Sequence, residues 1–310
     1  MSPKTGIALF CYKRADKLKI VVEALLKNPE CSSMDIVFFA DGYKGEKDQA
    51  DVEATRAYVD TITGFNSIER QYRERNVSTG PNFFQGISYM CENFDRFIVV
   101  EDDLVVTPNY LRYMLDALDF YRDEPSVFCV TGYCFPLRKN GYPYDTVMYN
   151  RFCSYGWASW SDRVKLVKWD KESLIRIVHT APGFKRNLNK TGMDLFRMVK
   201  KQINGTISTW DIQMQVHVAL NNFKVVYPVI SKTSNIGFGA GSTNTFGVDY
   251  LKTITDPGDK RSFRFCSPFV VAPGIQKQLK KPYGLPALAT RKVMNTMIQM
   301  AGKVKSFLSF

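Results

Sequence analysis

Short apolar segments alternate with amphipathic ones through the first hundred residues, and this alternation constrains the fold more than any other feature. The apolar runs predict strands, and the stretches with apolar residues three or four apart predict helices. A series of this kind is typical of a mostly parallel sheet with helices on both faces, so we expect an α/β fold. The expected strands are Ile7–Cys11, Ile36–Ala40, Ile68–Tyr72 and Phe97–Val100, and the expected helices are Lys17–Leu26, 48–58 and 82–92.

Acidic residues follow two of these strands directly. Asp41 ends the second strand, and Glu101, Asp102 and Asp103 follow the strand Phe97–Val100. Ligands of parallel sheets gather beyond the carboxyl ends of the strands, which is where these residues fall. Later in the chain we expect a helix at 211–221 and strands at Val225–Val229 and Phe265–Val271.

The three consecutive acids repel one another unless a cation lies between them. Mg²⁺ or Mn²⁺, with a diphosphate completing its shell, meets that need. Acids also favour helix N-termini, but Thr107 and Pro108 already provide a cap and a first-turn proline for the next helix. Spacing alone leaves a metal site and a solvated acidic loop equally open.

The segment Phe97-Ile-Val-Val-Glu-Asp-Asp-Leu-Val-Val-Thr-Pro-Asn-Tyr110 resembles the metal-binding strand of the GT-A fold glycosyltransferases. It is most similar to the Golgi α-mannoside β-1,2-N-acetylglucosaminyltransferase family, and the chain resembles a bacterial-type relative of that family. The resemblance implies a GT-A fold, a Rossmann-like mixed and mostly parallel sheet flanked by helices. It also implies that Asp103 binds Mn²⁺ or Mg²⁺, while Glu101 and Asp102 contact the donor sugar and ribose.

Further segments extend the resemblance to the donor. Cys11-Tyr-Lys-Arg14 resembles the segment whose arginine reaches the nucleotide diphosphate, which implies that role for Arg14. Ala40-Asp41-Gly42 resembles the turn whose aspartate recognises the base; by itself it is an ordinary Asp-Gly turn. The segment Ile230–Ser242 resembles the mobile loop over the donor, with Ser242 as a phosphate contact, although a glycine-rich hairpin is the other interpretation. The family's uracil-reading histidine has no counterpart in Ser78–Phe84, so uridine is less directly implied than diphosphate.

Two short segments extend the resemblance to the acceptor side. Trp210-Asp211 resembles the family's tryptophan-aspartate pair, which implies that Asp211 is the catalytic base; its alternative role is a helix cap. Tyr155-Gly-Trp157 resembles an element of the acceptor cleft, and Trp157 as a plain core residue is the alternative. The function implied is metal-dependent, inverting transfer of a sugar from a nucleoside-diphosphate sugar to a glycan or lipid-linked hydroxyl, with UDP as the nucleotide that the resemblance implies.

Two other functions stay open. A nucleotidyltransferase also combines a metal with nucleotides, but it normally carries a glycine-rich loop after the first strand, and the segment from Cys11 to Lys17 has no glycine. The second is a non-catalytic protein that binds membranes or nucleic acid on a transferase scaffold. Retention of both Asp103 and Asp211 argues against it.

The net charge of +12 is concentrated toward the C-terminus. No acid follows Asp259, whereas ten Lys or Arg do, and apolar residues recur at helical spacing from Met294 to Leu308. This pattern favours an anionic membrane surface over nucleic acid as the partner. We therefore divide the chain into a catalytic domain, residues 1–274, and a basic helical tail, residues 275–310, with a helix packed on the domain as the alternative.

The location we expect is cytoplasmic, with peripheral attachment to the membrane. No apolar run approaches the ~20 residues of a spanning helix, and Lys13 and Arg14 interrupt any export signal. The seven cysteines stand singly, which favours reduced thiols and argues against zinc.

Overall fold

The computed structural model describes residues 3–237, 252–270 and 272–308, and in the last helix it describes the side chains through Thr296. Helices and strands alternate from the N-terminus as the sequence predicts. The elements of this first half are β1 (Thr5–Cys11), α1 (Ala15–Leu26), η1 (Pro29–Ser33), β2 (Asp35–Ala40), α2 (Glu46–Asp60), β3 (Ser67–Tyr72), α3 (Thr79–Asn93), β4 (Arg96–Glu101), β5 (Leu104–Val106), α4 (Tyr110–Phe120) and β6 (Val127–Thr131).

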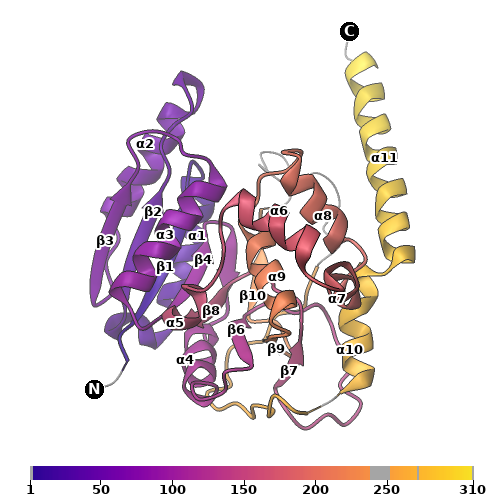
Figure 1. The fold of residues 1–310 in the computed structure, drawn as a ribbon. Helices are drawn as coiled ribbons and strands as arrows, with labels where there is room; N and C mark the ends of the chain where they lie inside the picture. Colours follow the sequence, from indigo (N-terminus) through magenta and orange to yellow (C-terminus); the bar gives the residue numbers. More distant parts are fainter. Residues whose placement is uncertain (1–2, 238–251, 271, 309–310) are drawn as a thin grey trace.

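The second half is richer in helices (Figure 1). Its elements are β7 (Thr146–Tyr149), β8 (Trp157–Trp160), α5 (Ser161–Val164), α6 (Lys171–Thr180), α7 (Phe184–Thr191), α8 (Leu195–Ile203), α9 (Asp211–Leu220), β9 (Lys224–Pro228), β10 (Thr233–Asn235), α10 (Pro273–Lys280), η2 (Lys281–Tyr283) and α11 (Leu285–Leu308).

The main sheet has the strand order β3-β2-β1-β4-β8-β6-β9-β7. The strands β3, β2, β1 and β4 are parallel, β8 runs antiparallel to both β4 and β6, β9 is parallel to β6, and β7 closes the far edge antiparallel. The expected fold class, a mixed and mostly parallel α/β sheet flanked by helices, is confirmed.

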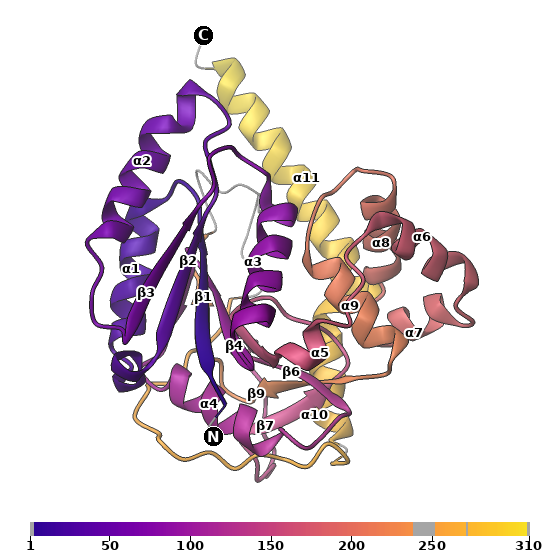
Figure 2. The same ribbon diagram turned by 60° about the vertical axis from the view of Figure 1, so that its left-hand side comes forward.

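Alternate residues of the central strands enter two different cores, one on each face of the sheet. Ile7 and Leu9 of β1 pack with α1 and α4. Ala8 and Phe10 pack with α3, α9 and α10 in the other core, which we call the main core. Because both faces are covered, the central strands read as nearly continuous apolar runs rather than as alternating patterns. Figure 2 shows the helices on the two sides of the sheet.

A two-stranded antiparallel ribbon, β5 with β10, lies beyond the carboxyl end of β4. Its pairing continues past the strands, because the N–H of Ile236 donates to the carbonyl of Asp103 at 2.8 Å. The ribbon therefore fixes the turn that carries the acidic trio. The sequence did not predict β10.

Residues 165–207, which we call the three-helix segment, comprise α6, α7 and α8 between β8 and α9. Leu174, Leu188 and Leu195 of this segment form a third core together with Ile212 and Val216 of α9. The opposite face of α9 packs in the main core. This segment was not predicted, although its apolar residues have helical spacing.

The C-terminal region divides at η2. Ile275 and Leu279 of α10 are buried in the main core, and the guanidinium of Arg151 lies 3.5 Å from the centre of the Tyr283 ring. From Leu285 onward, α11 extends away from the body (Figures 1 and 2). The expected tail helix is confirmed, and the division at residue 274 stays a prediction. Among the described residues, no helix combines the length and apolar character needed to cross a bilayer.

Two local predictions were wrong. No strand forms across the described part of Phe265–Val271. At Cys266, side chains take both hydrogen bonds of the backbone: its N–H donates to Thr146 Oγ1, and its carbonyl accepts from the Tyr121 hydroxyl. Thr107 does not cap α4; the helix begins at Tyr110, and the Thr107 hydroxyl donates to Asn109 Oδ1 instead.

Candidate active site

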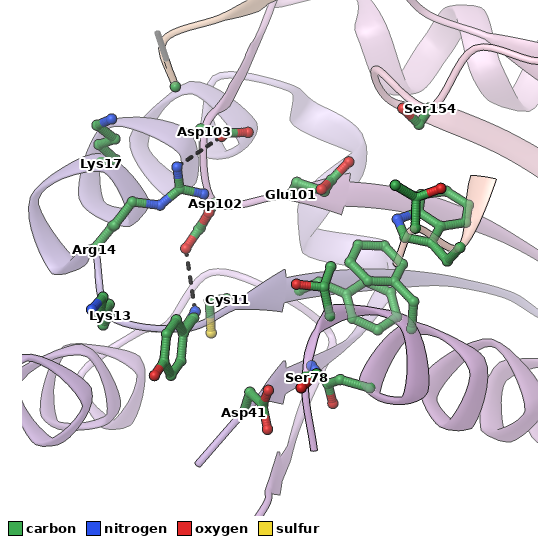
Figure 3. Close-up of a pocket in the computed structure, with 18 of the residues that line it drawn as sticks. Cys11, Lys13, Arg14, Lys17, Asp41, Ser78, Glu101, Asp102, Asp103 and Ser154 are labelled. Atoms are coloured by element: carbon green, nitrogen blue, oxygen red, sulfur yellow. Dashed lines mark hydrogen bonds and ion pairs between the residues drawn. The ribbon is translucent and has the colours of Figure 1, made fainter. Parts of the chain in front are cut away.

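A cavity of about 640 Å³ lies at the carboxyl edge of β1, β2 and β4. One side is formed by the β1–α1 turn, the end of β2 and the start of α3, and the other by the residues before α9 and around β10. Figure 3 shows the acidic and basic side chains that line it. Six of the site residues that the sequence predicted line this cavity: Arg14, Asp41, Glu101, Asp102, Asp103 and Asp211.

Arg14 joins two of the three acids. Its guanidinium donates to Asp103 Oδ2 at 2.9 Å and to Asp102 Oδ1, and the N–H of Tyr12 donates to Asp102 Oδ2 at 3.2 Å (Figure 3). Burial raises the pKa of Asp102 to about 6, although Arg14 opposes that rise. Burial would lower the pKa of Arg14, but the charges of Asp102 and Asp103 outweigh it and raise the pKa. Arg14 is thus the resident cation of the acidic turn.

Among the three acids, the surroundings oppose ionisation of Glu101 most strongly. Burial raises its pKa well above the ordinary range, and the charges of Asp103, Asp102 and Asp211 add to the rise. Only Arg14 acts in the opposite direction among the causes of the shift. An additional cation in the cavity would therefore stabilise the ionised form of Glu101.

The donor set of this turn is consistent with a hard divalent ion. Among the described residues, no three acids, histidines or cysteines are arranged to hold a metal by themselves. Mg²⁺ and Mn²⁺ are, however, commonly held by one or two carboxylates and by phosphate oxygens. The Asp103 carboxylate lines the cavity, and a Cβ atom at Gly237 would clash with its Oδ2. Glycine at 237 therefore leaves the space in which Asp103 presents its oxygens.

Asp41 is held by backbone groups. Its Oδ1 accepts hydrogen bonds from the N–H groups of Gly42 and Val77, both at 2.9 Å. The plain interpretation, an Asp-Gly turn, therefore describes part of its role, although the side chain also lines the cavity. Burial raises the pKa of Asp41. The cavity lining also includes Asn76, Ser78, Thr79 and Asn82, polar residues that the sequence did not single out.

Asp211 is the first residue of α9, and Trp210 occupies the N-cap position without a side-chain capping bond. Asp211 thus occupies the first helical position rather than the N-cap position of the alternative role, and backbone N–H groups of Asp211 and Ile212 hydrogen-bond its carboxylate. Burial raises the pKa of its carboxyl group. A carboxylate with a raised pKa at the wall of a cavity is suited to accept a proton.

An aromatic column positions the start of α9. The rings of Phe10 and Phe83 are stacked with centroids 3.9 Å apart, and those of Phe83 and Trp210 follow at 4.4 Å. All three residues line the cavity. The column connects β1 and α3 to Asp211 through its neighbour Trp210.

Trp157 and Ser242, the other two residues predicted for the site, are not among the described residues that line the cavity. Trp157 is fully buried in the main core and does not line the cavity, so the plain interpretation was right for it, while Tyr155 and Ser154 do line the cavity. Ser242 lies outside the described residues. Asn235 was missed, because nothing in the sequence signals the β5–β10 pairing that brings it to the cavity.

Neither the protein-family models nor the curated proteins give a match to the chain. Among solved structures it is similar to S. aureus TarS: a TarS 1–349 structure has 12% identity and a TM-score of 0.42, covering 76% of this chain and 60% of that one. A second TarS structure has 11% identity and a TM-score of 0.40, covering 73% and 37%. The chain thus spans less than two thirds of either TarS chain.

Two other solved structures have a comparable level of similarity. CMP:2-keto-3-deoxy-manno-octonic acid synthetase complexed with CTP has 11% identity and a TM-score of 0.40, covering 77% of this chain and 93% of that one. Mouse xyloside xylosyltransferase 1 in its apo form has 10% identity and a TM-score of 0.36, covering 71% and 82%. All four TM-scores are below 0.5, so these similarities do not define a function.

Proposed function

We propose that the chain is a metal-dependent, inverting glycosyltransferase that moves a sugar from a nucleoside-diphosphate donor to a hydroxyl of a glycan or lipid-linked acceptor. The observation that carries the proposal is the single cavity that brings Arg14, Asp41 and the acidic trio together with Asp211. The residues that we propose to contact the base, the diphosphate and the acceptor hydroxyl thus line the same cavity. The resemblance of the strand Phe97–Asp103 to the GT-A metal strand supports the same conclusion.

The chemistry requires one proton transfer. The acceptor oxygen attacks the anomeric carbon as the bond from that carbon to the diphosphate oxygen breaks, and the nucleoside diphosphate leaves with the bonding electrons. The hydroxyl proton goes to Asp211, whose burial and raised pKa fit it for this task. Attack from the face opposite the leaving group inverts the anomeric centre.

The donor would be held by groups from three strands. Asp41 and the polar residues at the start of α3 lie on the side suited to the base, and Glu101 and Asp102 would contact the donor sugar and the ribose. Arg14 lies beside these acids, where a diphosphate would enter. Asp103 would hold Mn²⁺ or Mg²⁺ together with the diphosphate. The metal, when bound, neutralises charge on the departing diphosphate.

Calorimetry and turnover with a panel of nucleotide sugars test the proposal. Asp103→Ala should lose metal-dependent donor binding and turnover together, whereas Asp211→Asn should keep donor binding and lose nucleotide release. The control is Asp123→Asn, at an exposed acid outside the cavity, which should retain both. Equal donor binding in the presence of a chelator, or full turnover in Asp211→Asn, would contradict the proposed mechanism.

For α11 we propose peripheral attachment to anionic lipid. Leu285 and Val293 are 63% and 53% exposed, and Lys292 is exposed beside them, so apolar and basic groups share this helix. The truncation that tests the idea ends at Gly284, because a cut at Gly274 would remove core residues Ile275 and Leu279. Loss of flotation with phosphatidylglycerol vesicles supports attachment, and undiminished flotation contradicts it.

A further inference from the structure

The three-helix segment is strongly basic. Residues 165–207 contain ten Lys or Arg and three Asp or Glu, a net charge of +7 out of +12 for the whole chain. This charge lies within the segment that runs directly into Ser208, Thr209, Trp210 and Asp211, all of which line the catalytic cavity. The basic residues are Lys165, Lys168, Lys171, Arg176, Lys185, Arg186, Lys190, Arg197, Lys200 and Lys201.

These cations have no acidic partners in the part of the chain that the structure describes, since no ion pair within 4.0 Å involves any of the ten. Two of the segment's three acids are otherwise engaged. Asp194 is paired with Arg151 at 3.0 and 2.8 Å, and Asp170 accepts a capping hydrogen bond from the N–H of Ser173 at 2.6 Å. The positive surface is therefore left uncompensated.

A second hollow, of about 470 Å³, opens among the helices of this segment, and none of its lining residues is acidic. The Nζ atoms of Lys185 and Lys200 lie 5.4 and 5.2 Å from the centre of the Phe196 ring. Asn189 Oδ1 is buried and has no hydrogen-bond partner. The lining residues are Val178, Ala181, Gly183, Phe184, Lys185, Arg186, Asn189 and Phe196.

This combination is suited to one chemical class. The C–H face of a sugar ring packs on an aromatic side chain, a sugar hydroxyl can donate to the unpaired oxygen of Asn189, and an acidic substituent is attracted by Lys185, Arg186 and Lys200. A membrane or a nucleic acid would use the charges but would not need the aromatic ring and the amide oxygen inside a hollow. An acid-bearing glycan uses all three.

We propose that the three-helix segment binds an anionic glycan, so that the acceptor of the reaction is a saccharide chain with phosphate or carboxylate groups. The hollow would hold one acidic unit while the growing end reaches Asp211. The identification of this glycan as the acceptor rests on the proposed function, but binding of the glycan can be measured without turnover.

Calorimetry on the full chain tests the binding, with a short oligogalacturonate as the carboxylate probe and inorganic polyphosphate as the phosphate probe. The variant Lys185→Ala/Arg186→Ala/Lys200→Ala should bind at least one of the two about tenfold more weakly. The matched control, Lys19→Ala/Lys27→Ala/Lys47→Ala, removes the same charge from exposed positions on α1, α2 and their flanks and should change binding by less than about twofold. A neutral maltooligosaccharide should bind neither protein measurably.

Three results would overturn the proposal: equal losses in the variant and the control, undiminished binding of both anionic probes by the variant, or losses confined to phosphatidylglycerol vesicles or oligo-dT. Asn189→Ala adds a test independent of charge, since it should weaken the oligogalacturonate more than the polyphosphate, which has no hydroxyl-bearing ring. Donor binding is measured in parallel. A wild-type chain that takes up no nucleotide sugar would contradict the proposed function, whereas loss of segment-dependent glycan binding would contradict only this inference.

Discussion

Replacing Lys232 with methionine should destabilise the protein strongly. Lys232 Nζ lies 2.6 Å from Asp256 Oδ2, and the two side chains are only 5% and 8% exposed. The other carboxylate oxygen of Asp256 accepts from Asn109 at 2.9 Å and from the N–H of Gly258 at 2.8 Å. The N–H of Thr107 donates to the carbonyl of Lys232 at 2.9 Å, so the pair lies at the base of the β5–β10 ribbon.

The magnitude follows from what remains after the substitution. Lys232→Met leaves Asp256 ionised and buried with two neutral donors, and breaking a buried pair in this way costs about 3–5 kcal/mol. Because the total stability of a domain is typically about 5–15 kcal/mol, a loss of this size is readily measured by urea denaturation. The control is Lys260→Met. Its ion pair with Asp145 is equally short at 2.6 Å, but Lys260 is 45% exposed, so its loss should cost at most about 1 kcal/mol.

The loss of stability in Lys232→Met should depend on pH. Burial would raise the pKa of Asp256, but Lys232 and the N–H of Gly258 outweigh it, and the net shift is downward. A carboxyl group with a lowered folded-state pKa contributes stability above its unfolded pKa and loses that contribution as the pH falls through the folded value. The difference between wild type and Lys232→Met should therefore shrink in acid. Equal destabilisation by the two substitutions at neutral pH would refute the reasoning.

Three further predictions concern the cavity. Because burial raises the pKa of Asp211, its ionised form opposes folding above that pKa, so Asp211→Asn should raise Tm at pH 7 and have little effect at pH 4; an unchanged Tm at pH 7 would contradict the shift. Gly237→Ala places a Cβ atom against Asp103 Oδ2 and should weaken metal-dependent donor binding by about tenfold to a hundredfold in calorimetry, with little change in Tm. Phe83→Ala should cost about 3–5 kcal/mol in urea denaturation, whereas Phe120→Ala, at a side chain 52% exposed, should cost far less.

The sequence predicted those parts of the site that depend on local order along the chain. Asp41 follows the apolar strand β2 directly, acids follow the apolar residues of β4, and Arg14 lies three residues after β1. Parallel pairing brings the ends of these three strands to one edge. The register pairs Phe10 with Phe39 and with Glu101, which places Arg14, Asp41 and Asp103 in the same region. Position relative to the end of a strand was sufficient information for these residues.

The parts that the sequence did not predict depend on contacts between distant segments. The apolar segment Phe265–Val271 has the composition of a strand, yet Thr146 and Tyr121 take the hydrogen bonds of its backbone at Cys266, and no local pattern records those partners. Asn235 reaches the cavity only because β10 pairs with β5, more than a hundred residues earlier. Side-chain competition for backbone groups and long-range pairing are the physical causes of both errors.

The helix α9 connects the two proposed binding surfaces. Met214 and Val218 pack on one side of α9 in the main core, and Ile212 and Val216 pack on the other side against the three-helix segment. Asp211 is at the N-terminus of this shared helix, and the stack of Trp210 on Phe83 fixes that end against α3. A glycan held by the three-helix segment would therefore be positioned relative to the proposed base by a rigid element rather than by a loop, and orienting a hydroxyl toward its base is the part of this chemistry that a protein scaffold can supply.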